Sequence, residues 1–185
     1  MLDLILLIDK KCFIIINKTL SNPIFDLIMP IFDNTKSFIP IMLFPFILAI
    51  IFDKRNRLQL ALLIPIVIIL IDQTGVLIKK IILRPRPWAI LEADQIFHLV
   101  SKKGKNYSFP SNHAANISGL AIVFSSIYSK YKYIFWTIAI TVIFSRVYIG
   151  VHYPLDVLVG WILGSTYGLI VIKIWYYIKN KKLKK

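Results

Sequence analysis

The chain has 185 residues, of which 57% are apolar and 17% charged, and its mean hydropathy is +0.70. Soluble domains contain about 45–50% apolar and about 25% charged residues, so this composition excludes a soluble globular protein. The net charge of +14 would point to a nucleic-acid partner in a soluble chain. Here the basic residues lie between long apolar runs, and we expect a membrane protein that binds no nucleic acid.

The N-terminal region, residues 1–37, is apolar but interrupted by charges. On a helix, the charges of residues 1–20 would cover about half of the circumference, which is typical of a helix that lies in the membrane interface. Ser21-Asn22-Pro23 then breaks the chain before a second short apolar piece at 24–33. Asp3 stands where a signal peptide would be positive, so this region is expected to be retained. Whether the two pieces together form a further crossing stays open.

Five later segments are long and apolar enough to cross a bilayer. None alternates as a barrel strand would, and an isolated strand would leave its backbone unpaired in lipid. The sequence therefore predicts an all-α, polytopic transmembrane bundle of five to six spans with an N-terminal interfacial helix. Residues 1–185 are expected to form one domain, and the single Cys12 excludes an intrachain disulfide. The expected spans are 38–52, 58–78, 113–129, 133–149 and 155–178.

The charges of the loops predict the orientation. Three basic residues lie in 53–57, two in 130–132 and five in the tail 179–185. Alternate loops share one face, so these three, including the C-terminus, are expected to be cytoplasmic. The opposite, extracytoplasmic face receives the connections 79–112 and 146–154, which are also basic. Basic residues are usually scarce on an extracytoplasmic face, so their presence here predicts that they serve a functional anion site.

The first candidate group on that face is Lys79 with Arg86-Pro87. Pro85 and Pro87 favour an extended chain that turns back over the mouth of the bundle. Lys79 and Arg86 can bind a phosphate, Arg as a bidentate fork and Lys as a point charge. Taken alone, the pair fits snorkelling basic residues at a membrane edge even better.

The second group, Pro110-Ser111-Asn112-His113, opens a predicted span. Ser111 suits an N-cap, and the free N–H groups of a helix start attract anions. His113 can give a proton to a leaving oxygen. Taken alone, ordinary capping with an interfacial histidine explains the pattern equally well.

The third group is Ser145-Arg146, His152 and Asp156. His152 and Asp156 are four residues apart, so a helix would put the carboxylate one turn from the imidazole. An Asp that binds one ring nitrogen leaves the other nitrogen free to attack as a nucleophile. The plainer alternative is a capping Asp beside a histidine.

Together these groups resemble the three signature motifs of the type 2 phosphatidic acid phosphatase family. Six residues separate Lys79 from Arg86-Pro87, Pro-Ser-x-His follows, and five residues separate Arg146 from His152, with Asp156 beyond. The resemblance covers about 79–156 by motif and the five-span core by architecture. Where the family commonly has Gly, this chain has Asn112, which tolerates a left-handed backbone and whose amide can contact phosphate.

The resemblance implies a role for each matched residue. His152 would be the nucleophile that forms a phosphohistidine, and Asp156 would orient it. His113 would protonate the leaving group and then activate water. The phosphate would be bound by Lys79, Arg86, Ser111, Asn112 and Arg146. Cations and a helix N-terminus would neutralise the phosphoryl group, so the resemblance implies no metal and no cofactor.

The function implied is that of a metal-independent hydrolase of a lipid phosphate or diphosphate, embedded in the bacterial inner (plasma) membrane with an extracytoplasmic site. Lipid A 1-phosphate or undecaprenyl diphosphate is the expected substrate, and phosphatidylglycerol phosphate is an alternative. Phosphotransfer to a lipid hydroxyl and a non-catalytic lipid-binding role also stay open, as does the oligomeric state.

Three further polar residues lie in or near these segments. Arg84 can contact a second phosphate. Asp72 either supports Lys79 or faces water, and His98 matches no motif.

Overall fold

The computed structural model describes residues 1–33, 35–92, 94–97 and 107–183. Throughout these residues the regular structure is helical, apart from one isolated bridge between Pro85 and Tyr107. The α-helices are α1 (Leu2–Ile14), α2 (Pro23–Ile28), α3 (Thr35–Phe52), α4 (Arg57–Ile82), α5 (Pro87–Ile90), α6 (Asn112–Ile127), α7 (Lys132–Tyr148) and α8 (Pro154–Leu183). A π-helical turn, Ile15–Thr19, extends α1, and 3-10 turns occur at Met29–Phe32 and Ser129–Tyr131.

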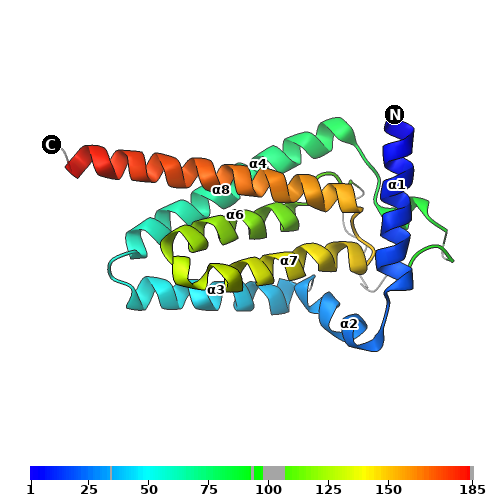
Figure 1. The fold of residues 1–185 in the computed structure, drawn as a ribbon, viewed down its shortest axis with the longest axis horizontal. Coiled ribbons are helices and arrows are strands. Elements are labelled where there is room, and N and C mark those ends of the chain that lie inside the picture. The colour runs from blue at the N-terminus through cyan, green and yellow to red at the C-terminus, as the bar shows by residue number, and fades with distance from the viewer. Residues whose placement is uncertain (34, 93, 98–106, 184–185) are drawn as a thin grey trace.

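Each of the five predicted spans is a helix, and five long helices, α3, α4, α6, α7 and α8, run side by side along the molecule (Figure 1). Two of them are long and apolar enough to cross a membrane by length and composition, Arg57–Ile82 and Pro154–Lys181. Helix α8 continues to Leu183, so the first part of the predicted basic tail is helical. Residues 184–185, like His98, lie outside the described residues.

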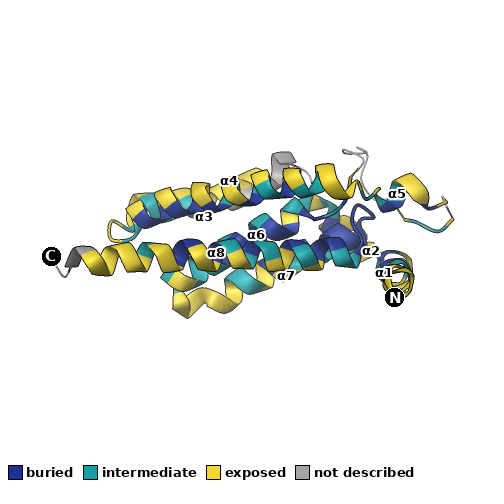
Figure 2. Cartoon of the chain, turned by 90° about the horizontal axis from the view of Figure 1, so that it is seen from above, coloured by how far each residue is buried: buried dark blue, intermediate teal, exposed yellow. Residues whose placement is uncertain are grey.

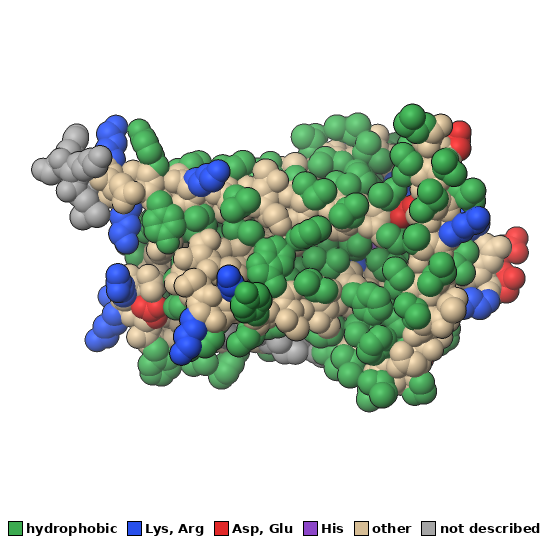
Figure 3. All heavy atoms as spheres, viewed as in Figure 1, with side chains coloured by type: hydrophobic (Ala, Val, Ile, Leu, Met, Phe, Trp, Pro, Cys, Tyr) green, Lys and Arg blue, Asp and Glu red, His purple; other side chains and the backbone are tan. Residues whose placement is uncertain are grey.

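The three basic segments lie at one end of the bundle, as predicted from alternate loops. The α3–α4 connection, the α6–α7 turn and the end of α8 gather at the left of Figure 1, and Lys and Arg side chains cluster there in Figure 3. Apolar side chains cover most of the length between the two ends. An apolar belt bounded by charged ends is the surface that a bilayer solvates.

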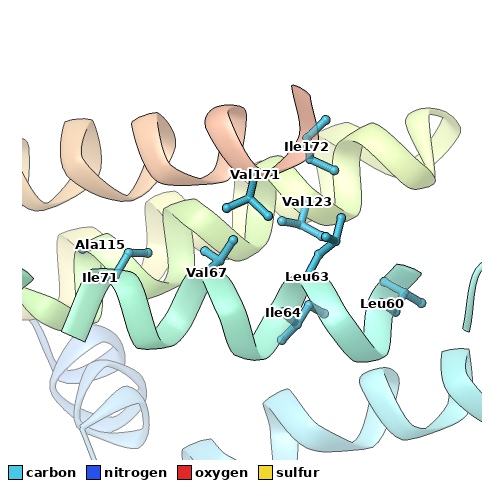
Figure 4. Close-up of a cluster of buried hydrophobic side chains, with 9 residues drawn as sticks. All are labelled: Leu60, Leu63, Ile64, Val67, Ile71, Ala115, Val123, Val171 and Ile172. Atoms are coloured by element: carbon cyan, nitrogen blue, oxygen red, sulfur yellow. The ribbon is translucent and has the colours of Figure 1, made fainter. Parts of the chain in front are cut away.

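The main core lies between α4, α6 and α8 (Figure 4). Its nine buried residues are Leu60, Leu63, Ile64, Val67, Ile71, Ala115, Val123, Val171 and Ile172. Figure 2 shows that burial concentrates on the inward faces of the helices, while the outward faces of α4 and α8 are exposed. Exposed Ile, Leu and Val side chains on those outward faces, such as Ile69, Leu77 and Ile162, suit contact with lipid.

Three glycines spaced four apart on α8, Gly160, Gly164 and Gly168, bring it against α6. A Cβ on Gly164 would lie 1.9 Å from the Ala115 carbonyl oxygen, and one on Gly160 would lie 2.5 Å from the Ser111 carbonyl oxygen. Small residues at this spacing let membrane helices approach backbone to backbone. The contact sets the position of the first turn of α6, where the candidate site begins.

The N-terminal region crosses the opposite end of the bundle, where α1 lies beside the start of α8 (Figure 1). The Tyr148 hydroxyl donates to Asp26 at 2.6 Å and accepts from the Asn22 backbone N–H at 2.9 Å. Asn17, which is fully buried, donates to the Tyr148 carbonyl oxygen. These bonds fasten the N-terminal region to the end of α7.

Candidate active site

The third motif forms the buried centre of this end of the molecule. His152 lies between α7 and α8 and is 3% exposed, and Asp156 in the first turn of α8 is fully buried. Asp156 Oδ2 lies 3.5 Å from His152 Nδ1, a long contact, and accepts the Tyr153 backbone N–H at 2.8 Å. The carboxylate therefore faces Nδ1 of the imidazole, as the spacing predicted, although α8 begins at Pro154 and His152 lies just before the helix instead of within it.

The backbone of Arg146 holds His152 from the α7 side. The Arg146 carbonyl oxygen accepts the His152 backbone N–H at 3.1 Å, across the turn at Gly150, which has a φ of 84°. A positive φ is easily adopted only by glycine. This turn brings the end of α7 back beside the histidine.

The first motif reaches the same centre. Arg86 donates to the Val151 carbonyl oxygen at 2.9 Å, and its Nη1 lies 3.4 Å from His152 Nε2, the nitrogen opposite Asp156. Lys79, in the last turn of α4, donates to Asn112 Oδ1 at 2.7 Å and to the Pro110 carbonyl oxygen. Two cations from the first motif therefore flank the second and third motifs.

The second motif begins α6 as predicted, with Ser111 as the N-cap whose hydroxyl oxygen accepts the Ala114 N–H at 3.4 Å. The Ser111 N–H donates to the Asp156 carbonyl oxygen at 2.9 Å, which joins the starts of α6 and α8. His113, in the first turn of α6, is exposed and lies within electrostatic range of Arg146 and His152. The structure therefore brings together all eight predicted site residues.

The side chain of Asn112 is already engaged by protein. Its amide Nδ2 donates to Asp72 at 3.0 Å while its Oδ1 accepts from Lys79, and Asn116 donates to the same Asp72 oxygen. Asp72 thus supports Lys79 through Asn112, one of the two alternatives left open by the sequence. The expected direct contact of the Asn112 amide with phosphate does not fit these bonds.

Arg84 also differs from its prediction. Its guanidinium pairs with Asp156 at 2.7 Å and with Asp9 of α1, so it is not available for a second phosphate. Asp9 was predicted in an interfacial helix but is only 3% exposed. No signal in the spacing of the motifs pointed to Asp9.

Asp33 is a further residue that sequence reasoning missed. It accepts from Arg146 Nη1 at 2.7 Å, while the rest of that guanidinium contacts Ser145 Oγ at 3.3 Å. Arg146 is 1% exposed, so Asp33 neutralises a buried cation that a phosphate would otherwise meet. The sequence did contain one signal for Asp33, namely a charged residue in the short apolar piece 24–33.

We expect Asp33→Asn to lower the free energy of unfolding by about 2 kcal/mol, because a buried guanidinium loses its countercharge. An anion in the site can replace that charge, so orthovanadate should raise the melting temperature of the variant more than that of the wild type. Thermal unfolding with and without vanadate measures both effects. Asp3→Asn, on an exposed residue, is the control, and an equal vanadate shift in Asp33→Asn and the wild type would contradict the assignment.

Burial lowers the pKa of His152 to about 4, with Arg86 and Lys79 acting in the same direction and Asp156 opposing them. The imidazole is therefore neutral at any pH well above 4. We expect the acid limb of kcat/KM, which reports the free protein, to fall through about pH 4 instead of the pH 6.5 of a free histidine. A pH–rate profile checks this, and a midpoint near 6.5 with the fold intact would contradict it.

The chain is similar to known proteins in sequence and in fold. The family model described as the PAP2 superfamily matches residues 57–180. An undecaprenyl-diphosphatase of Sulfolobus acidocaldarius is 34% identical over 128 residues, which cover 69% of this chain and 60% of that protein. A lipid A 4'-phosphatase of Porphyromonas gingivalis is 33% identical over 49% of this chain and 39% of its own length. The chain thus spans less than two thirds of these relatives.

Two solved structures are similar over more of their length. Aquifex aeolicus LpxE superposes with a TM-score of 0.73 and 30% identity, covering 88% of this chain and 93% of that one. A Bacillus subtilis phosphatidylglycerolphosphate phosphatase of the transmembrane PAP2 type superposes with a TM-score of 0.65 at 23% identity, over 92% of this chain and 84% of that one, and shows the shared fold.

Proposed function

Because the chain belongs to the PAP2 superfamily, we propose that it is a membrane lipid phosphatase that hydrolyses a lipid phosphate or diphosphate. The observation that carries the proposal is the meeting of Lys79, Arg86 and Arg146 around the His152–Asp156 pair at one end of an apolar bundle. A cluster of cations beside a neutral imidazole that faces a carboxylate suits attack on a phosphoryl group.

In the proposed first step, His152 Nε2 attacks phosphorus, the N–P bond forms, and the bond to the leaving lipid oxygen breaks. His113 gives its proton to that oxygen. Asp156 holds the Nδ1–H and stabilises the positive imidazole that results. In the second step, His113 takes a proton from water, whose oxygen attacks phosphorus, and phosphate leaves as the N–P bond breaks.

The cations supply the electrostatic stabilisation. Charge on the equatorial oxygens of the transferred phosphoryl group would be met by Lys79, Arg86 and Arg146. The Ser111 hydroxyl and the backbone N–H groups of Asn112 and His113 at the start of α6 would add donors. We propose that the reaction needs neither metal nor cofactor, because these groups already provide the positive charge.

The apolar exterior supports a substrate whose hydrocarbon chain stays in lipid while its phosphate enters the site. The names of the relatives favour undecaprenyl diphosphate or a phosphate of lipid A as this substrate. Phosphatidylglycerol phosphate is the next candidate, from the second structural relative.

The proposed topology has five spans, α3, α4, α6, α7 and α8, in the inner (plasma) membrane of a bacterium. The basic end, including the C-terminus, would be cytoplasmic and the site extracytoplasmic. We propose one domain, 1–185, with residues 1–37 at the membrane interface. Cysteine-accessibility labelling of single-cysteine variants at Lys54 and His113, in a Cys12→Ser background, tests the two sides.

Phosphate release in detergent with EDTA tests the function. Purified protein is supplied in turn with lipid A, undecaprenyl diphosphate, phosphatidylglycerol phosphate and phosphatidic acid. We expect release from one of the first two and none from His152→Ala. Phosphorylated lipid in place of free phosphate would show phosphotransfer to a lipid hydroxyl instead of hydrolysis. No turnover of any lipid would leave a non-catalytic lipid-binding role and overturn the proposal.

A further inference from the structure

Arg84 connects the proposed catalytic pair to the N-terminal helix. Its Nη1 donates to Asp156 Oδ1 at 2.7 Å, and its Nη2 donates to Asp9 Oδ2. The guanidinium carbon lies 4.2 Å from the centre of the Tyr153 ring, which stacks against its face. Arg84 therefore has partners on both edges and on one face of its plane.

Asp9 completes the connection from α1. Its second oxygen, Oδ1, accepts the Leu155 backbone N–H at 2.8 Å in the first turn of α8. Both Asp9 oxygens are therefore occupied, one by Arg84 and one by the helix that bears Asp156. Asp9 lies outside the 57–180 match to the family, so this carboxylate comes from a part of the chain that the family model does not cover.

The backbone holds Arg84 in this place. Leu83 ends α4 in the left-handed region, with a φ of 51°, and turns the chain away from the helix axis. The Arg84 carbonyl oxygen then accepts the Ser108 N–H at 2.7 Å, and Pro85 pairs with Tyr107. A side chain held by its own backbone and by three partners has little freedom to reach a substrate.

The two oxygens of Asp156 have separate partners. Oδ2 faces the His152 imidazole and the Tyr153 N–H, whereas Oδ1 faces Arg84. Without Arg84, only the Tyr153 N–H holds the carboxylate, which is then freer to rotate away from His152. Because the 3.5 Å contact with His152 is already long, a small rotation would break it.

We propose that Arg84 and Asp9 are positioning residues for phosphoryl transfer: Arg84 fixes the Asp156 carboxylate toward His152, and Asp9 holds Arg84 and offsets its charge. This inference rests on the proposed function. It gives α1 a part in the reaction, since a helix that crosses the end of the bundle supplies a carboxylate three contacts from His152, through Arg84 and Asp156.

Loss of Arg84 and loss of Asp9 should shift the pH dependence of the reaction in opposite directions, because the two residues have opposite charges. The other charged or titratable groups around His152 are Arg86, Lys79, Asp156 and His113. Removing Arg84 takes away a positive charge that offsets Asp156, which favours the imidazolium and moves the acid limb of kcat/KM to higher pH. Removing Asp9 leaves Arg84 less compensated, which moves the limb to lower pH. A purely structural loss would move neither.

The test compares Arg84→Gln and Asp9→Asn with the wild type. In each variant we expect kcat to fall about 10²-fold with KM within about twofold, because misorientation affects attack more than binding. Arg84→Lys keeps the charge but cannot reach both carboxylates, so kcat should fall while the acid limb stays near that of the wild type. Lys80→Gln, at an exposed residue of the last turn of α4, and Asp3→Asn, at an exposed residue of α1, should behave as the wild type.

Binding of orthovanadate separates failure of this inference from failure of the proposed function. Vanadate bonds to a well-placed histidine nitrogen without turnover, so it reports on the site even if no tested lipid is hydrolysed. We expect weaker vanadate binding in Arg84→Gln than in Lys80→Gln, with both folded by thermal unfolding. Equal vanadate affinity, or an unchanged kcat and acid limb in Arg84→Gln and Asp9→Asn, overturns the positioning role.

Discussion

Replacing His152 with alanine should lower phosphate release at least about 10⁴-fold and abolish formation of a phosphoenzyme. The imidazole is the nucleophile in the proposed mechanism, and the cations that remain can bind phosphate but cannot form the covalent intermediate. Phosphate release and labelling with a ³²P-lipid, quenched in alkaline detergent because phosphohistidine is hydrolysed by acid, measure the two effects.

The same labelling experiment should give a different result for His113→Ala than for His152→Ala. With a good leaving group, His113→Ala should still form phosphoenzyme but hydrolyse it slowly, so labelled protein should accumulate. His152→Ala should never label. Substantial turnover by His152→Ala, or labelling that survives in it, would contradict the assignment of the nucleophile.

Gly164→Val should lower the free energy of unfolding by about 3 kcal/mol or more, the second large effect that we expect. A Cβ at this position would meet the Ala115 carbonyl oxygen at 1.9 Å, and a backbone atom cannot move aside as a side chain can. Helix α8 would have to separate from α6, which also shifts Ser111 and Asp156, joined across this contact at 2.9 Å.

Thermal unfolding and kcat should therefore fall together in Gly164→Val. Thr166→Leu adds volume two residues further along α8, on an exposed position, and should change neither. A Gly164→Val protein with wild-type melting temperature would show that the two helices do not depend on this close approach.

The positions of the helices followed well from the sequence. The spans predicted at 113–129 and 133–149 differ from α6 and α7 by one or two residues at each end. Such agreement is possible because long apolar runs leave the backbone no partner but itself, and because Ser111 and Pro154 mark helix starts locally. Helix α4 runs four residues beyond its predicted end, since nothing before Leu83 stops it.

The partners of the site residues did not follow from the sequence. Arg146 pairs with Asp33 over 113 residues, Arg84 with Asp9 over 75, and Asp9 with Leu155 over 146. No local pattern encodes such separations. Arg84 was predicted to be able to contact a second phosphate, but its half-buried guanidinium pairs instead with Asp9 and Asp156, the carboxylates that the packing brings nearest.

What the sequence determined by itself was the family and the location of its motifs along the chain: residues of defined type and spacing, each at the end of an apolar run. Those features depend on local spacing and on the hydrophobic lengths that a membrane requires. Only the tertiary structure decided which carboxylate neutralises which cation and how closely α6 approaches α8. Buried charges must be paired and small residues must meet backbone, and only the packed helices determine where either can happen.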